Sequence, residues 1–266
     1  MKAIEIMNLL EKWAPMDLVD EWDNTGFQIG DPERQIEKIL LSLDLDREVF
    51  KMAKDINAQM IITHHPIIFS PLKSLTKLNY KEKLIYDIIK EDIVVYNAHT
   101  NLDIAKGGVN DRLAEILGIK NTAPLKIVHN ELETNEEKFG YGRVGKIRKM
   151  PLEKYLNIIK RGLNTQHLIV YGNIDRSVET VAVCGGSGSS FIKDAFMMGA
   201  DIYITGDIKY HDAQYGNELG LTLINAGHFH TEKIILPVVK DYIERSVEKP
   251  LDIEIYNQSS PPYAVF

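Results

Sequence analysis

Short runs of apolar and β-branched residues alternate along this chain with longer segments in which apolar positions recur every three or four residues. A run of four to six apolar residues between charged or turn-forming residues is typical of a buried strand, and the longer spacing is typical of a helix with one buried face. The elements that this pattern predicts in the first half are a helix at 1–13, a strand at 38–43, a helix at 47–57, a strand at 60–64, a helix at 80–90, a strand at 93–97 and a helix at 108–117.

The same alternation returns in the second half. The elements expected there are strands at 143–147, 167–171, 180–184, 202–205 and 221–225, helices at 152–163, 190–198, 212–219 and 231–246, and a last strand from 251. Pro237 is expected to kink or split the last of these helices, because proline interrupts the hydrogen bonds of a helix interior. Alternating strands and helices predict a layered α/β fold whose sheets are largely parallel.

A charged, turn-rich segment at about 125–140 separates the two halves and includes Glu131, Glu133, Glu136 and Glu137. We therefore expect a first α/β domain over residues 1–125 and a second over 126–266, whose C-terminal part can cross back to the first.

Two adjacent histidines, His64 and His65, end the apolar run at 60–64, and Pro66 after them favours extended backbone at His65. Neighbouring side chains of a strand point to opposite faces. The pair therefore binds one ion only if the chain bends, and otherwise serves two adjacent ions. The alternative is two strand-end histidines in a polar loop.

The two halves match each other at constant offsets. Ile39 corresponds to Val181 and Thr63 to Thr205 (181 − 39 and 205 − 63 are both 142). After the third strand of each half, His99 and Asp103 correspond to His228 and Glu232 (228 − 99 and 232 − 103 are both 129). We infer two similar α/β domains related by internal duplication.

Strand ends related in this way collect at the edges where ligands of α/β sheets bind, so we expect a metal site in the cleft between the domains. The set contains three imidazoles and two carboxylates: His64, His65, Asp103, His228 and Glu232. Nitrogen and oxygen donors without thiolate suit Zn, Mn or Fe(II), and a shared carboxylate can bridge two such ions.

Composition narrows the function classes. The 266 residues carry a net charge of −7 without a block of Lys or Arg, which argues against nucleic-acid binding. Cys184 is the only cysteine, so an intramolecular disulfide is impossible and a reducing compartment is favoured. No run of about 18 apolar residues predicts a membrane span. We expect a cytoplasmic protein.

Several blocks of the sequence resemble the GTP cyclohydrolase I type 2 homologues, also called the NGG-interacting-factor-three-like family. The blocks are 21–26 (EWDNTG), 63–69 (THHPIIF), 98–103 (AHTNLD), 107–111 (GGVND), 184–188 (CGGSG), 204–207 (ITGD), and Gly227-His228 with Thr231-Glu232.

The resemblance implies two similar α/β domains, two divalent metal ions per chain and a toroidal homohexamer. The ligands it implies fall on the five residues already named. The interval 125–178 is too short for the domain that some members carry between the halves, so this is the compact form. His230 stands where many members have a small residue, and its relation to the metals stays open.

Other residues are candidates for chemistry near the ions. His99 is a candidate acid/base group or supports a ligand, and the alternative is a hydrogen-bonded core histidine. Asp207 and His211 can line the cleft. Gly186, Ser187 and Gly188 lie in a loop between a strand and a helix that can hold a phosphate, or that simply turns tightly. Cys184 is read as a buried apolar residue.

Two functions are consistent with the sequence. The first is a metal-dependent hydrolase acting on a nucleotide-like or phosphate-containing substrate, and the family name implies GTP cyclohydrolase activity. The second is a non-enzymatic metal-binding, metal-delivery or adaptor protein that forms a ring.

Overall fold

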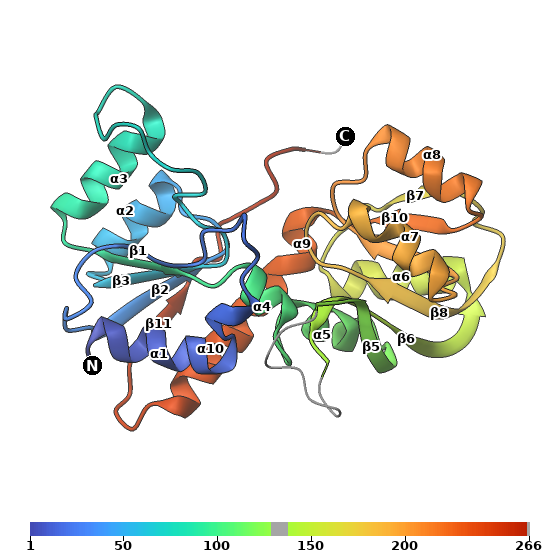
Figure 1. Ribbon diagram of the computed structural model, residues 1–266, viewed down its shortest axis with the longest axis horizontal. Helices are drawn as coiled ribbons and strands as arrows, with labels where there is room; N and C mark the ends of the chain where they lie inside the picture. Colours follow the sequence, from blue (N-terminus) through green and yellow to red (C-terminus); the bar gives the residue numbers. More distant parts are fainter. Residues whose placement is uncertain (129–137, 265–266) are drawn as a thin grey trace. The chain divides into compact units, whose positions relative to one another are not determined.

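The apolar runs of the first half form the centre of a five-stranded sheet (Figure 1). The computed structural model describes residues 1–128 and 138–264 of the chain. The strand order is β1-β4-β3-β2-β11, and every pair is parallel except β1 with β4. The strands are β1 (Gly26–Ile29), β2 (Lys38–Ser42), β3 (Met60–Thr63), β4 (Val94–Asn97) and β11 (Asp252–Ile255).

Helices cover both faces of this sheet. On one face, α2 (Arg47–Asp55) and α3 (Tyr80–Lys90) bury an apolar cluster against β2, β3 and β4. On the other, α1 (Ala3–Trp13) packs against α10 (Leu236–Ser246), which also contacts β2. Asp46 starts α2 by accepting hydrogen bonds from the amides of Glu48 and Val49, as a helix N-cap does.

The second half forms a six-stranded sheet of order β5-β6-β8-β9-β10-β7. Strands β8, β9 and β10 are parallel, and the other pairs are antiparallel. The strands are β5 (Lys120–Ile127), β6 (Gly140–Pro151), β7 (Ile169–Tyr171), β8 (Ser177–Val183), β9 (Ile202–Thr205) and β10 (Thr222–Asn225).

One face of this sheet packs against α5 (Val109–Ile116) and α6 (Leu152–Gly162), and the other packs against α7 (Ile192–Met197) and α8 (Tyr210–Glu218). Two short helices, α4 (Thr100–Ile104) and α9 (His228–Glu232), follow β4 and β10. The remaining elements are the 3-10 turns η1 (Met16–Leu18), η2 (Ser189–Phe191) and η3 (Lys233–Ile235).

Four strands of each sheet share one order. The order β1-β4-β3-β2 in the first sheet recurs as β7-β10-β9-β8 in the second. The pairing register recurs too: Leu41 pairs with Ile62, and Val183 pairs with Ile204, so the offset of 142 (183 − 41 and 204 − 62) relates both partners. The predicted α/β fold is confirmed, with more antiparallel pairs at the sheet edges than the sequence suggested.

The chain divides into two compact units, the first made of Met1–Leu102 with Leu236–Ser259 and the second of Asp103–Ile235 with Ser260–Phe266. The first division falls before α5 rather than near residue 125, because α5 buries Leu113 and Ala114 in the core of the second sheet. Conversely, α10 and β11 belong to the first unit, where β11 pairs with β2.

Local differences from the predicted elements have simple causes. The helix expected over 231–246 is split into α9, η3 and α10, and Pro237 is the second residue of α10, a position where its missing N–H costs nothing. Strand β5 was not predicted, because its side chains are mostly exposed and leave no apolar run. Glu131, Glu133, Glu136 and Glu137 lie outside the described residues.

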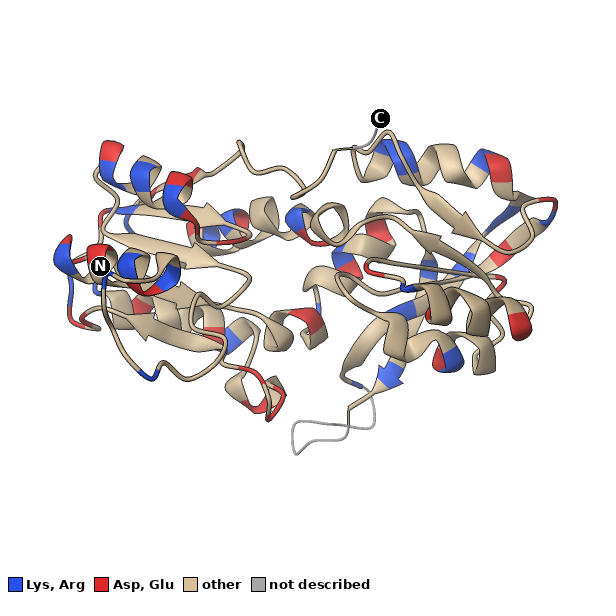
Figure 2. Cartoon of the chain, turned by 90° about the horizontal axis from the view of Figure 1, so that it is seen from above, with Lys and Arg blue, Asp and Glu red and all other residues tan. Residues whose placement is uncertain are grey.

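Charges on the surface are mixed. Figure 2 shows Lys and Arg interspersed with Asp and Glu along the helices of each unit. None of the helices that the structure describes combines the length and the apolar character that a membrane span needs.

Candidate metal centre

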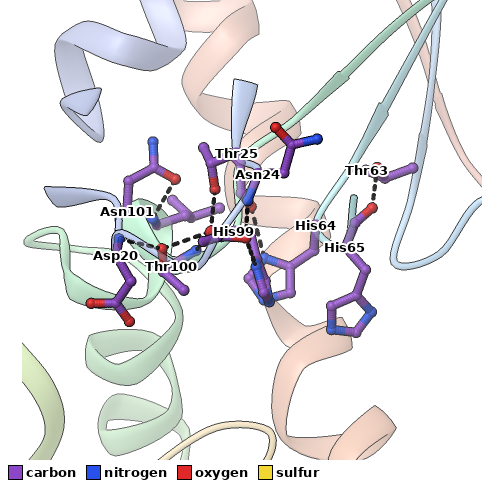
Figure 3. Close-up of polar contacts among 12 residues, drawn as sticks. Asp20, Asn24, Thr25, Thr63, His64, His65, His99, Thr100 and Asn101 are labelled. Atoms are coloured by element: carbon purple, nitrogen blue, oxygen red, sulfur yellow. Dashed lines mark hydrogen bonds and ion pairs between the residues drawn. The ribbon is translucent and has the colours of Figure 1, made fainter. Parts of the chain in front are cut away.

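Three imidazoles of the first unit form a cluster at the carboxyl ends of β3 and β4 (Figure 3). His64 and His65 follow Thr63, the last residue of β3, and His99 comes two residues after the end of β4. The ring centroids are 5.0 Å (His64 to His65), 5.2 Å (His64 to His99) and 5.4 Å (His65 to His99) apart. One ring nitrogen of each lies within 4.8 Å of the others, so the three could hold a metal ion.

The chain bends after β3 in a way that lets both neighbours join the cluster. The amides of His64 and His65 donate to the carbonyls of Ser42 and Leu43, and the Thr63 hydroxyl donates to the His65 carbonyl at 2.7 Å. The two ring centroids are 5.0 Å apart, and one ring nitrogen of each lies within 4.8 Å of the other. A single site can therefore take nitrogens from both.

Each of these imidazoles is held through its Nδ1 atom. The acceptors, all at 2.8 Å, are the Ala98 carbonyl for His64, the Asp44 carboxylate for His65 and the Asp23 carboxylate for His99. A carbonyl or a carboxylate accepts, so Nδ1 carries the proton and the lone pair of the neutral ring lies on Nε2. Metal-binding histidines are commonly oriented in this way.

Asp23 is the most heavily hydrogen-bonded of these acceptors. Its side chain is fully buried beside His99 and also accepts from the hydroxyls of Thr25 (2.6 Å) and Thr100 (2.7 Å). Burial by itself raises the pKa of Asp23, but the hydrogen bonds from His99, Thr25 and Thr100 outweigh it and hold the pKa well below its usual range. Asp23 is therefore an ionised anchor for the His99 ring.

The second unit places one imidazole between two carboxylates. His228 Nδ1 lies 2.7 Å from an Asp207 oxygen, and His228 Nε2 lies 2.9 Å from an oxygen of the buried Glu232. A neutral imidazole carries one N–H, so only a further proton or a cation satisfies both contacts. Glu232 and Asp103 also have carboxylate oxygens within 4.8 Å of each other, an arrangement that a cation stabilises.

The glycine-rich loop after β8 lies directly against these ligand candidates. A Cβ atom on Gly186 would be 2.0 Å from Glu232 Oε1, and Gly186 has a φ of +63°. The amides of Gly186 and Gly188 donate to the hydroxyls of Thr231 (3.0 Å) and Thr205 (2.9 Å). The Gly186 and Gly188 amides therefore fix the loop, with Ser187 between them, in close contact with Glu232.

The other sequence candidates have separate places. Asp207 orients His228 through its contact with Nδ1. The Nδ1 atom of His211, on α8, faces Gln214 Oε1 at 2.9 Å. Burial and Lys233 lower the pKa of His230, against a hydrogen bond to the Leu163 backbone. Neither His211 nor His230 belongs to a His, Cys, Asp or Glu group close enough to hold an ion, within the described part of the chain.

The donor chemistry fits a divalent transition metal. The first unit offers three imidazole nitrogens, and the second offers Asp103, Glu232 and His228. Such nitrogen and oxygen sets suit Zn, Mn or Fe(II). The only cysteine, Cys184, is buried, and this burial, followed by the nearby Asp103 carboxylate, raises the pKa of its thiol. Cys184 therefore stays protonated.

Comparison with known proteins assigns the family. The profile of the Duf34/NIF3 family (NGG1p interacting factor 3) matches residues 1–262. The chain belongs to the Duf34/NIF3 family. The resemblance inferred from the sequence blocks is thereby confirmed.

Individual relatives agree with this assignment. A relative from Clostridium perfringens, named "GTP cyclohydrolase 1 type 2 homolog", is 36% identical over 264 residues and 99% of each chain. The solved structure of a Bacillus cereus protein related to NIF3 superposes with a TM-score of 0.93 at 27% identity, covering 100% of this chain and 99% of the other. The alignment with a Halalkalibacterium halodurans relative, 27% identical, spans 356 positions and 95% of that protein, so that relative contains a segment which this compact chain lacks.

Sequence reasoning missed the two aspartates that hold His65 and His99. Asp44 lies two residues after β2, and Asp23 lies in the turn-rich block EWDNTG. Acidic residues just after a strand, at the edge where other strand-end histidines collect, are the signal that could have found Asp44.

Proposed function

We propose that this Duf34/NIF3 protein binds two divalent metal ions per chain and is a metal-dependent hydrolase of a nucleotide-like or phosphate-containing substrate. The proposed ligands are His64 and His65 of the first unit with Asp103, His228 and Glu232 of the second. The observation that carries the proposal is the oriented imidazole cluster, in which each Nδ1 is held by a protein acceptor and each lone pair is left on Nε2. The name of its relatives, "GTP cyclohydrolase 1 type 2 homolog", supports a nucleotide as the substrate.

Two such ions, when bound, supply Lewis acidity and lower the pKa of coordinated water. The protein's own part is to hold the ligands rigidly and to move protons. His99, fixed by the buried Asp23, is the proposed acid/base group, because its ring lies about 5 Å from the proposed ligands His64 and His65.

Asp207 is proposed to orient His228. The glycine-rich loop with Gly186, Ser187 and Gly188 is proposed to line the substrate site together with His211. From the family resemblance we also propose a homo-oligomer, a hexamer, which light scattering on the purified protein tests.

Metal analysis tests the site directly. Protein purified without chelator and reconstituted with Zn, Mn or Fe(II) is expected to hold about two ions per chain, and the double variant His65→Ala, Glu232→Ala less than one. The matched control is His167→Ala, Glu218→Ala, which removes the same two residue types from exposed positions outside the proposed site. Fewer than one ion per chain in the parent protein would contradict the dinuclear site.

Turnover tests the hydrolase. The metal-loaded parent and the control variant are expected to hydrolyse GTP or a related nucleotide at least about 100-fold faster than the His65→Ala, Glu232→Ala variant. Equal rates in the parent, the control variant and the His65→Ala, Glu232→Ala variant would contradict the hydrolase proposal. Full metal content without turnover of any nucleotide or phosphoester leaves metal binding or delivery as the function.

A further inference from the structure

Two large aromatic side chains lie exposed beside the imidazole cluster. Trp22 is 59% exposed and Phe69 is 46% exposed. Their ring centroids are 6.0 Å apart, and the Trp22 ring lies 6.2 Å from His99 in an edge-to-face arrangement of 84°. All of these residues belong to the first unit. The pair therefore adjoins the proposed reaction site and is not an isolated surface contact.

The segments that carry the two rings are fixed to each other. Trp22 lies in a β-turn closed by the hydrogen bond from the Asp23 amide to the Asp20 carbonyl, at 2.9 Å. The Asn24 side-chain amide donates to the Ile68 carbonyl, next to Phe69. Gln28 adds two further bonds, to the Asn24 carbonyl (2.8 Å) and from the Ile68 amide (3.1 Å).

The turn is also fixed to the imidazole cluster. Asp23, the neighbour of Trp22, is held by His99, Thr25 and Thr100. Trp22 is therefore displayed to solvent by a turn that has little freedom to bury it. A binding surface that is already in place loses little conformational entropy when a ligand arrives.

The angle between the Trp22 and Phe69 rings indicates which shape of ligand can contact both. The planes of Trp22 and Phe69 meet at 50°, which forms a corner and not a parallel sandwich. A flat ring can stack on the face of Trp22 with its edge against Phe69, since aromatic pairs prefer stacked and edge-to-face contacts at about 4.5–7 Å. We propose that Trp22 and Phe69 bind the planar heteroaromatic ring of a small-molecule substrate, stacked on Trp22 beside the imidazole cluster.

This inference rests on the proposed function, because it assigns the ring of that substrate to a place. The His99 ring centroid lies 6.2 Å from that of Trp22 and 5.2 Å and 5.4 Å from those of His64 and His65. A ring stacked on Trp22 is thus within reach of the acid/base group. A substrate without a flat ring, such as a simple sugar phosphate, gains nothing from the corner.

Fluorescence with two probes tests the stacking. The chain has two tryptophans, and Trp13→Phe keeps an aromatic ring on Tyr242, with which Trp13 stacks at 4.6 Å. In this background, with excitation at a wavelength that tyrosine does not absorb, emission comes from Trp22 alone. GMP added to the metal-loaded protein is expected to quench it in a saturable way, whereas ribose 5-phosphate, which has the same sugar and phosphate but no base, leaves it unchanged.

Calorimetry with the same probes gives the magnitude. Trp22→Leu is expected to weaken GMP binding about tenfold or more, Phe69→Leu less, and Trp22→Phe least, with ribose 5-phosphate binding unaltered in all three. Tyr80→Leu is the matched control, because Tyr80 is also 59% exposed in the same unit but lies at the start of α3. It is expected to bind GMP like the parent.

Three outcomes overturn the inference: no quenching by GMP, equal GMP affinity in Trp22→Leu and parent, or a change of oligomeric state in Trp22→Leu with unchanged GMP affinity. The last outcome assigns Trp22 and Phe69 to an interface between copies of the chain.

The hydrolase proposal fails on different results. If GMP binding depends on Trp22 but no nucleotide is turned over, the aromatic binding site stands and the hydrolase proposal is wrong. If turnover needs His65 and Glu232 but KM is the same in Trp22→Leu as in the parent, the hydrolase proposal stands and the aromatic binding site is wrong.

Discussion

At the scale of single residues, Gly186 decides how closely the loop after β8 approaches Glu232. The position has a φ of +63°, and a Cβ there would lie 2.0 Å from the carboxylate oxygen. Cβ atoms essentially never come this close to another heavy atom, so a side chain would have to push Glu232 away from His228. The glycine is required for space as well as for its backbone conformation.

We therefore predict that Gly186→Ala loses metal binding as well as stability. The left-handed backbone costs about 1 to 2 kcal/mol for any residue with a Cβ, and the clash adds a similar amount. Gly199→Ala is the control, since Gly199 has a φ of +71° and no atom within 4 Å of the added Cβ. Urea denaturation and metal content are measured for both; equal metal content in the two variants would show that Glu232 tolerates the displacement.

Part of the candidate site could be predicted from residue types and spacing. His64, His65, Asp103, His228 and Glu232 follow predicted strands or lie on the next turn of helix, so topology alone suggested that they collect. The residues that orient these imidazoles through hydrogen bonds could not be predicted in the same way. Asp23 and His99 are 76 residues apart, and nothing in the local pattern pairs one acidic turn residue with one particular imidazole.

At the scale of elements, Glu82 connects the start of α3 to the loop before it. Its carboxylate accepts hydrogen bonds from the Ser74 hydroxyl (2.9 Å), the Thr76 amide (2.8 Å) and hydroxyl (2.6 Å), and the Asn79 side chain (2.6 Å). Asn79 in turn caps α3 by accepting a hydrogen bond from the Glu82 amide at 2.8 Å. One carboxylate thus orders the turn that leads into the helix.

We predict that this loop loosens in acid. The bonds from Thr76 and then Ser74 lower the pKa of Glu82 below its ordinary value of 4.5. The stabilisation is therefore complete above about pH 4.5 and is lost as the pH falls through the lowered value. Hydrogen exchange at the Thr76 amide, corrected for intrinsic rates, is expected to speed up in that range and to be fast at every pH in Glu82→Gln. The control Glu91→Gln, at the other end of α3, should keep the protection.

Elements with strong periodicity were predicted closely, and those without it were not. Helix α3 and strand β9 occupy the expected residues, because each shows a regular apolar pattern. Strand β5 was missed, since an antiparallel edge strand with exposed side chains is stabilised by its pairing with β6 and not by burial. Such pairing depends on the partner strand, which a local pattern does not contain.

At the scale of the whole molecule, each half of the chain contributes to the other half's unit. The helix that follows the ligand candidate Asp103, α5, packs on the second sheet, whereas α10 and β11, which follow Glu232, complete the first. Sequence patterns predicted the elements of this exchange and a C-terminal part that can cross back, but they grouped the helix at 108–117 with the first domain, because α5 and α10 have similar apolar faces. Only packing distinguishes where each belongs.

We predict that fragments 1–125 and 126–266 do not fold alone. The first lacks α10 and β11, and the second lacks α5, so each exposes an apolar surface that its missing helix buries. Far-UV circular dichroism with hydrogen exchange is expected to show little protection in either fragment and substantial recovery when both are mixed or co-expressed. A protected, monomeric fragment 1–125 would contradict this.

The return of the chain to its first sheet also sets the order in which the protein is completed on the ribosome. Strand β2 emerges early, but its partner β11 is among the last elements synthesised. Until then the edge of β2 is an open template for pairing with another chain, a known route to aggregation. The three imidazoles of the first unit are therefore made long before β11 completes their sheet. In a newly made chain, His64, His65 and His99 can therefore meet a metal ion before β11 has completed the sheet that positions them.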